Sequence, residues 1–112
     1  MAKIKVLVKD PGKKPELMEV ENSLRELQKL IGGYIEAITK KGVVMLVDEE
    51  GYQKNLPANF MDYQVDDFIV GRAVFIGTKG NNFTDVPEGI ARNILEVMPE
   101  ACPEFWDDRK EE

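Results

Sequence analysis

Alternating apolar and polar side chains predict two strands near the start of the chain. Within residues 3–9, Ile4, Val6 and Val8 occupy alternate positions, and residues 16–21 repeat the alternation. A Pro-Gly sequence between the two segments is typical of a turn. We therefore expect the two strands to pair with each other as antiparallel neighbours.

Two other segments carry apolar residues at helical spacing, and both have signals for helix ends. The first begins at Ser23, which a glutamate follows three positions later as in a capping box, and it ends at Gly32-Gly33. The second has the acidic residues Asp85 and Glu88 at its start, and Pro99 ends it. Each helix is amphipathic, so each is expected to pack one face on a sheet.

The middle of the chain has the composition of further strands. Residues 34–40 are strand-like, and residues 43–48 are apolar almost throughout, as expected of a central strand buried on both faces. A short strand is also predicted over residues 52–56. The pattern is lost in residues 57–67 and 77–85, which are predicted to be loops.

Two apolar runs, residues 68–70 and 73–76, complete the predicted sheet as one bulged strand or two short ones. The short turns between strands favour antiparallel pairing. The predicted fold class is therefore α+β, a single mainly antiparallel β-sheet with two helices packed on one face. Residues 1–98 form this domain, and residues 99–112 form an acidic, aromatic-containing C-terminal tail.

The charge of the chain narrows the class of partner. The 112 residues carry 15 Lys and Arg against 21 Asp and Glu, a net charge of −6. Residues 1–56 hold 10 basic and 9 acidic side chains, whereas residues 57–112 hold 5 basic and 12 acidic ones. We expect no direct nucleic-acid binding, because that needs many basic contacts to phosphates. A protein partner with a basic surface is favoured instead.

The chain has no histidine, which excludes several catalytic mechanisms and one kind of metal site. Serine–histidine catalysis, cysteine–histidine catalysis and imidazole ligation of zinc are all ruled out. Cys102 is the only cysteine, which is typical of a reducing compartment. The N-terminus resembles no signal peptide, and no apolar run approaches the roughly 20 residues that span a bilayer. We therefore expect a cytoplasmic, non-enzymatic protein that has no cofactor and no membrane contact.

Turn and strand residues recur along the chain in a distinctive order. They are Pro11-Gly12, Pro15, Asn22, Leu24, Leu27, Gly32-Gly33-Tyr34-Ile35-Glu36, Glu50-Gly51, Leu56-Pro57-Ala58-Asn59 and Asp67-Phe68-Ile69-Val70-Gly71. In this order they resemble DUF3846, a family of small proteins known only as a domain of unknown function. Its members sit largely in bacteriophages, plasmids and other mobile elements. The resemblance thus implies an accessory protein in the cytoplasm of a bacterial host, and it implies no catalytic residues.

The C-terminal tail carries the first candidate site, for a protein partner. It consists of Glu104, Phe105, Trp106, Asp107 and Asp108. Buried aromatic side chains anchor many interfaces, and the surrounding carboxylates would steer the tail towards a basic surface. Two other interpretations stay open: the aromatic residues fold back over the sheet or the terminal helix, or the tail is disordered.

A second candidate site, for a small ligand, combines Tyr34, Glu36, Asn59, Asp66 and Asp67. In a strand, Tyr34 and Glu36 point to one face, where a ring can stack on a base and a carboxylate can accept hydrogen bonds from a nucleotide-like ligand. The alternative interpretation is an exposed polar strand face. The paired carboxylates match no calcium-binding loop, so no metal site is expected.

Two main hypotheses of function follow. In the first, the protein binds and inhibits a host protein, for instance of a defence system, because an acidic surface can occupy Lys- and Arg-rich sites. In the second, it sequesters a nucleotide-like signal in a pocket. Such a pocket can be completed at a subunit interface, so a homo-oligomer stays open. A phage structural or replication accessory role is a further alternative.

Overall fold

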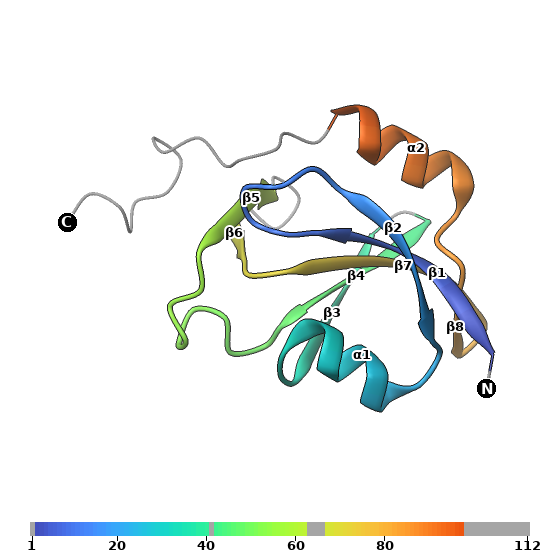
Figure 1. The fold of residues 1–112 in the computed structure, drawn as a ribbon, viewed down its shortest axis with the longest axis horizontal. Helices are drawn as coiled ribbons and strands as arrows, with labels where there is room; N and C mark the ends of the chain where they lie inside the picture. Colours follow the sequence, from blue (N-terminus) through green and yellow to red (C-terminus); the bar gives the residue numbers. More distant parts are fainter. Residues whose placement is uncertain (1, 41, 63–66, 98–112) are drawn as a thin grey trace.

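The main sheet joins six strands through antiparallel pairs. The computed structural model describes residues 2–40, 42–62 and 67–97. The strand order is β2-β1-β7-β4-β3, and β8 pairs with the C-terminal end of β7 (Figure 1). The strands are β1 (Lys3–Lys9), β2 (Glu16–Glu21), β3 (Ile35–Lys40), β4 (Val43–Asp48), β7 (Ala73–Lys79) and β8 (Asn82–Thr84).

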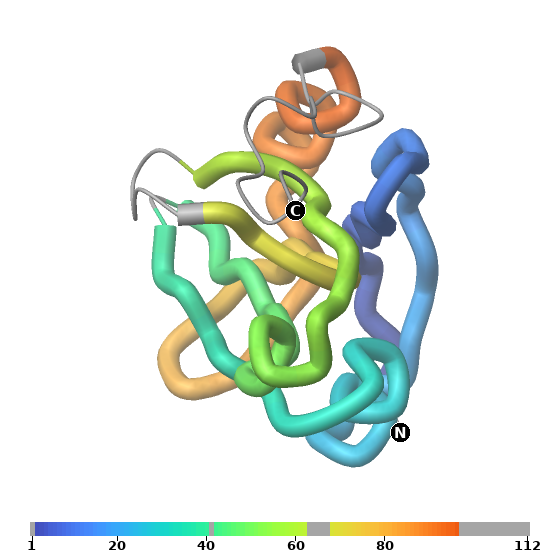
Figure 2. Tube along the Cα trace, turned by 90° about the vertical axis from the view of Figure 1, so that its left-hand side faces the viewer, coloured from blue at the N-terminus to red at the C-terminus, as the bar shows by residue number. Residues whose placement is uncertain are grey.

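A β-hairpin and two helices cover this sheet. The hairpin is a second, two-stranded sheet of β5 (Ala58–Asp62) and β6 (Asp67–Val70). The helices are α1 (Leu24–Ile31) and α2 (Glu88–Val97). Figure 2, in which the hairpin faces the viewer, shows α2 above it and α1 below it.

The core has two halves, one on each face of the main sheet. All six residues of β4 are buried, as predicted for a central strand. Val44 and Leu46 pack in one cluster with Leu27 of α1. Met45 of β4 packs in the other cluster with β5, β6 and Ala91 of α2. The main sheet is therefore the middle layer of the fold.

The predicted α+β class with a mainly antiparallel sheet is confirmed, but the prediction that both helices pack on one face is wrong. The two helices lie on opposite faces of the sheet (Figure 1). The physical reason is in β4 and β7, which are apolar on both faces and so need a covering layer on each side. There is also a second small sheet beside the single one expected.

The first helix begins and ends where predicted, but only half of the expected capping box forms, because the Ser23 N–H donates to the Glu21 carbonyl at 2.9 Å instead of to Glu26. The hydroxyl oxygen of Ser23 accepts a hydrogen bond from the backbone N–H of Glu26 at 3.2 Å. At the other end, Gly32 has a φ of 94° and donates its N–H to the Gln28 carbonyl at 2.8 Å. Glycine adopts this left-handed conformation at little cost, which explains the stop.

The start of the second helix differs from the prediction. Asp85 was expected to cap it, but the Asp85 carboxylate accepts a hydrogen bond from the backbone N–H of Lys5 on β1 at 2.8 Å. The N–H of Val86 also donates to the Lys5 carbonyl at 2.8 Å. Residues 85–86 therefore tie the segment before α2 to the sheet.

Three predictions in the middle of the chain are wrong. Residues 52–56 form turns rather than a strand, and Asn55 has a left-handed φ of 56°. Residues 58–62, predicted to be part of a loop, form β5. Part of the predicted loop 77–85 belongs to the β7–β8 hairpin. The run split at Gly71 forms two strands in different sheets, because Gly71 has a φ of 73° and redirects the chain.

Candidate functional site

A small pocket opens between the β3–β4 hairpin and β6, and we call it the Glu36 pocket. Its volume is about 210 Å³. It is lined by Glu36, Ile38, Val47, Asp48, Glu49, Tyr52, Phe68, Ile69 and Val70. Strand pairing places Glu36 opposite Val47, on the sheet face that the β5–β6 hairpin covers. The floor of the pocket is therefore apolar and continues the core.

Two exposed carboxylates lie at the rim of the pocket. Glu36 comes from β3 and Glu49 from the turn after β4, and both residues are exposed. Within the described residues, neither side chain has a hydrogen bond or an ion pair. The rim can therefore attract a cation without first breaking an internal contact.

A third carboxylate, Asp48, has a structural task. Its side chain is 2% exposed, and it lies 2.8 Å from the Lys54 ammonium. It also accepts a hydrogen bond from the N–H of Glu50 at 2.8 Å. The hydrogen bond to Asp48 raises the pKa of Lys54, against the opposing effect of burial. The Lys54 ammonium balances the negative charge of Asp48. The hydrogen bond from Glu50 to Asp48 fixes the turn that carries Glu49.

Tyr52 forms one wall of the pocket. Its hydroxyl donates a hydrogen bond to the Phe68 carbonyl at 2.9 Å, which ties the turn to β6. The residue remains 49% exposed. An aromatic face beside carboxylates suits a guanidinium or ammonium group, since the ring attracts cations through its quadrupole.

The five residues predicted to bind a small ligand do not form one site. Tyr34 is 65% exposed and lies beside α1, in a depression that also contains Lys29. Glu36 lines the pocket described above. Asp67 pairs with Asp62 in the β5–β6 hairpin, and Asp66 lies outside the described residues.

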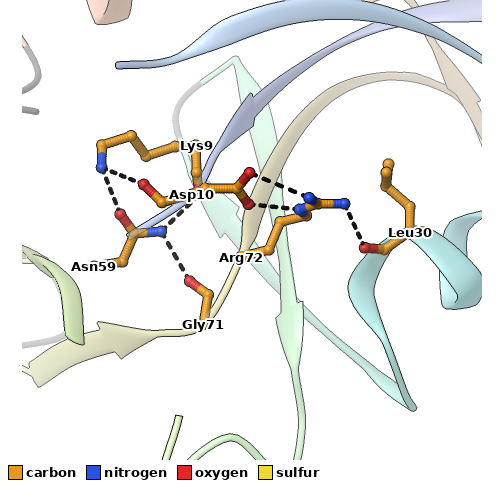
Figure 3. Close-up of polar contacts among 6 residues, drawn as sticks. All are labelled: Lys9, Asp10, Leu30, Asn59, Gly71 and Arg72. Carbon is orange, nitrogen blue, oxygen red and sulfur yellow. Dashed lines mark hydrogen bonds and ion pairs between the residues drawn. The ribbon is translucent and has the colours of Figure 1, made fainter. Parts of the chain in front are cut away.

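Asn59, the fifth of these residues, is fully buried in a polar network (Figure 3). Its amide nitrogen donates to the carbonyls of Lys9 at 2.6 Å and Gly71 at 2.8 Å. Its amide oxygen accepts from the Lys9 ammonium at 2.8 Å. The side chain therefore joins β5 to the end of β1 and to the β6–β7 junction, which is a structural task.

An adjacent clamp joins the same junction to α1 (Figure 3). The Arg72 guanidinium donates to both carboxylate oxygens of Asp10, at 2.6 and 3.1 Å. It also donates to the Leu30 carbonyl in the last turn of α1 at 3.0 Å. The hydrogen bond to Asp10 raises the pKa of Arg72. This bidentate pair leaves no local signal in the sequence, because its members are 62 positions apart.

The predicted partner-binding residues of the tail lie outside the described part of the chain. These are Glu104, Phe105, Trp106, Asp107 and Asp108. In the residues that the structure describes, no group of three or more potential metal ligands comes together. No helix there is long and apolar enough to cross a membrane.

Comparison with known protein families shows to which family the chain belongs. A model of the family described as Domain of unknown function (DUF3846) matches residues 4–98. The chain belongs to the DUF3846 family. Comparisons with curated proteins and with solved structures found no match.

Motif residues that carried the DUF3846 resemblance surround the Glu36 pocket. Phe68, Ile69 and Val70 line it, and Gly51 lies against Val70. A Cβ atom on Gly51 would lie 2.7 Å from Val70 Cγ2, closer than carbon atoms approach. The turn that carries Tyr52 can therefore reach β6 because position 51 has no side chain.

Proposed function

We propose that this DUF3846 protein is a non-enzymatic accessory protein of a phage or other mobile element that binds and inhibits a host protein. Proteins of host defence systems are one such class of target. The observation that carries the proposal is the Glu36 pocket, which joins two unpaired carboxylates to an aromatic wall and an apolar floor. The protein would act in the cytoplasm, where host targets are found.

The chemistry of the pocket favours a lysine or arginine side chain of the partner. Such a side chain has an apolar stem, which fits the floor, and a cationic head, which fits Glu36 and Glu49. The volume of about 210 Å³ suits one side chain. It is below the roughly 300–1,000 Å³ typical of pockets for drug-sized ligands. Carboxylates at the rim would also repel a phosphate, which disfavours a nucleotide there.

The tail adds long-range attraction to the same kind of partner. Residues 99–112 carry six acidic and two basic side chains, together with Phe105 and Trp106. Clustered charge of one sign accelerates encounter with a surface of the opposite sign, and salt screens the effect. The tail and the pocket therefore favour the same basic partner.

The proposal is tested by capturing host proteins on the immobilised chain and measuring affinity for the purified partner. We expect the double variant Glu36→Gln/Glu49→Gln to lose affinity by about tenfold or more, since a charge-assisted hydrogen bond contributes about 1.5–3 kcal/mol. Glu16→Gln/Glu19→Gln on β2 is the matched control, because it removes two exposed glutamates away from the pocket.

Equal affinity of both double variants for the partner would contradict the proposal. Thermal-shift measurements with nucleotides provide an independent test of the ligand-binding hypothesis. A ligand at a hundred times its Kd adds about 2.7 kcal/mol to stability. A clear rise in melting temperature with a nucleotide would therefore favour ligand sequestration over inhibition of a partner protein.

A further inference from the structure

A groove on the described part of the molecule lies between α2 and one edge of the main sheet, and we call it the α2 groove. Its volume is about 670 Å³. Leu17 of β2 and Leu95 of α2 line it, as do the basic residues Lys5 and Arg92. The Glu36 pocket lies elsewhere and shares no lining residue with it.

The floor of the α2 groove extends the hydrophobic core to the surface. Val86 and Ala91 line the groove and belong to the core cluster on this face of the sheet. Leu17 pairs with the buried Leu7, so both side chains lie on that same face. Yet Leu17 is 50% exposed and Leu95 is 44% exposed. Two leucines left open beside a groove indicate a surface that another apolar group covers.

We propose that Phe105 and Trp106 of the same chain occupy the α2 groove. The groove wall is α2 itself, which ends at Val97, two residues after Leu95. The eight residues from Val97 to Phe105 span up to about 26–29 Å when extended. The ten-residue helix is only about 15 Å long, so the aromatic pair can reach any point of the groove.

Connectivity favours this occupant over a separate molecule. The groove is lined by two basic residues, Lys5 and Arg92, and by two acidic ones, Asp85 and Glu88, so its charges balance. The attraction is therefore between the aromatic side chains of the tail and the apolar floor of the groove. A short connection also gives the tail a high effective concentration at the groove.

The docked tail adds a step to partner binding. A partner that takes the aromatic pair must displace it from the α2 groove, whereas a partner that uses only the Glu36 pocket need not. This inference concerns the free protein and goes beyond the proposed function. It can fail while the Glu36 pocket still binds a partner, and the two experiments use different variants.

Trp106 is the only tryptophan of the chain, so its fluorescence reports on the tail alone. We expect the emission maximum of the native full-length chain to lie at shorter wavelength than in urea, with reduced acrylamide quenching. Leu17→Glu and Leu95→Glu each place a carboxylate in the groove, so each should shift emission towards the unfolded value. Leu24→Glu is the control, because Leu24 is 64% exposed on α1 and lies outside the groove.

Circular dichroism melts verify that each variant is folded. The inference is overturned if native Trp106 emits and is quenched as in urea, or if both groove variants leave its emission unchanged. Emission that shifts on dilution together with a change in mass by light scattering would identify a second copy as the occupant, and it would also overturn docking within one chain.

Discussion

At the scale of single residues, buried polar groups fix how the β5–β6 hairpin sits on the main sheet. Asn59 is buried completely, and its amide makes three hydrogen bonds to Lys9 and Gly71 (Figure 3). Buried polar groups are stable when they are hydrogen-bonded and costly when a partner is lost. Asn59, which the sequence suggested as a ligand-binding residue, therefore holds β5 against the main sheet instead.

Replacing Asn59 should destabilise the fold strongly. We expect Asn59→Ala to lower the free energy of unfolding by about 2–4 kcal/mol, since each buried group that loses a partner costs about 1–3 kcal/mol. Asn93→Ala on the exposed side of α2 is the control and should change stability by less than about 0.5 kcal/mol. Urea unfolding followed by circular dichroism measures both. Similar values for the two variants would show that the network is not needed.

The ion pair between Lys54 and Asp48 should make stability depend on alkaline pH. The pKa of Lys54 is raised above its ordinary 10.5 by the hydrogen bond to Asp48. The contribution of the pair is therefore fully present below pH 10.5 and is lost as the pH rises through the higher folded-state pKa.

The expected result is a difference between wild type and Lys54→Met that is constant from neutral pH to about pH 10 and then shrinks. Subtracting the variant removes the effects of other titrating groups, which the two chains share. Urea unfolding at a series of pH values gives the difference in unfolding free energy. A difference that stays constant up to the highest pH would contradict this role for Lys54.

At the scale of elements, close backbone approaches decide which connections are tolerated. A Cβ atom on Gly77 of β7 would collide with the backbone carbonyl of Asp85, in the segment that leads to α2. That segment is held by two hydrogen bonds to Lys5, so it has little room to move away. Gly77 thus permits the close packing of β7 against the segment before α2.

Two glycine substitutions should consequently have opposite effects. We expect Gly77→Ala to destabilise the fold by about 1–3 kcal/mol, the usual cost of overpacking. Gly89→Ala should stabilise it by up to about 1 kcal/mol, because position 89 is helical and a Cβ there would meet nothing within 4 Å. Thermal and urea unfolding measure both effects. A neutral Gly77→Ala would show that β7 and the segment before α2 do not need this close approach.

The elements also show what the sequence can and cannot predict. Residues 3–9, 16–21 and 43–48 match their predicted strands, because alternating side chains and apolar runs are typical of strands. The alternation of residues 16–21 did not report burial, since no residue of β2 is buried. Strand β5 was missed because Asn59 and Asp62 are polar yet buried, which breaks the alternation. Partners many residues away satisfy these side chains, and no local pattern reveals such partners.

The candidate site was predicted only in part for a similar reason. Glu36 was singled out as a polar residue on a strand, and it does line a pocket. Tyr52 and Glu49 were not associated with it, because residues 52–56 were predicted to form a strand. The pairing of β3 with β4 could have indicated that Glu36 and Glu49 are neighbours. Its register places Glu36 opposite Val47, close to the turn that carries Glu49.

At the scale of the whole molecule, the excess of negative charge is concentrated near the C-terminus. The last fifteen residues carry six acidic and two basic side chains, out of a net charge of −6 for the chain. Within the described residues, some carboxylates are held in ion pairs, such as Asp48 with Lys54 and Asp10 with Arg72. The unpaired Glu36 and Glu49 at an apolar pocket are therefore the part of the domain best suited to a cationic group.

The most direct test of this account is an NMR titration of the isotope-labelled full-length chain with N-acetyl-arginine methylamide. We predict saturable shifts of the backbone amides of Glu36, Glu49, Tyr52 and Phe68, and no such shifts with the uncharged citrulline analogue. The Glu36→Gln/Glu49→Gln variant should lose the response, and Glu16→Gln/Glu19→Gln should retain it. Equal shifts with arginine and citrulline, or arginine shifts confined to other parts of the molecule, would contradict the claim that the Glu36 pocket binds cationic side chains.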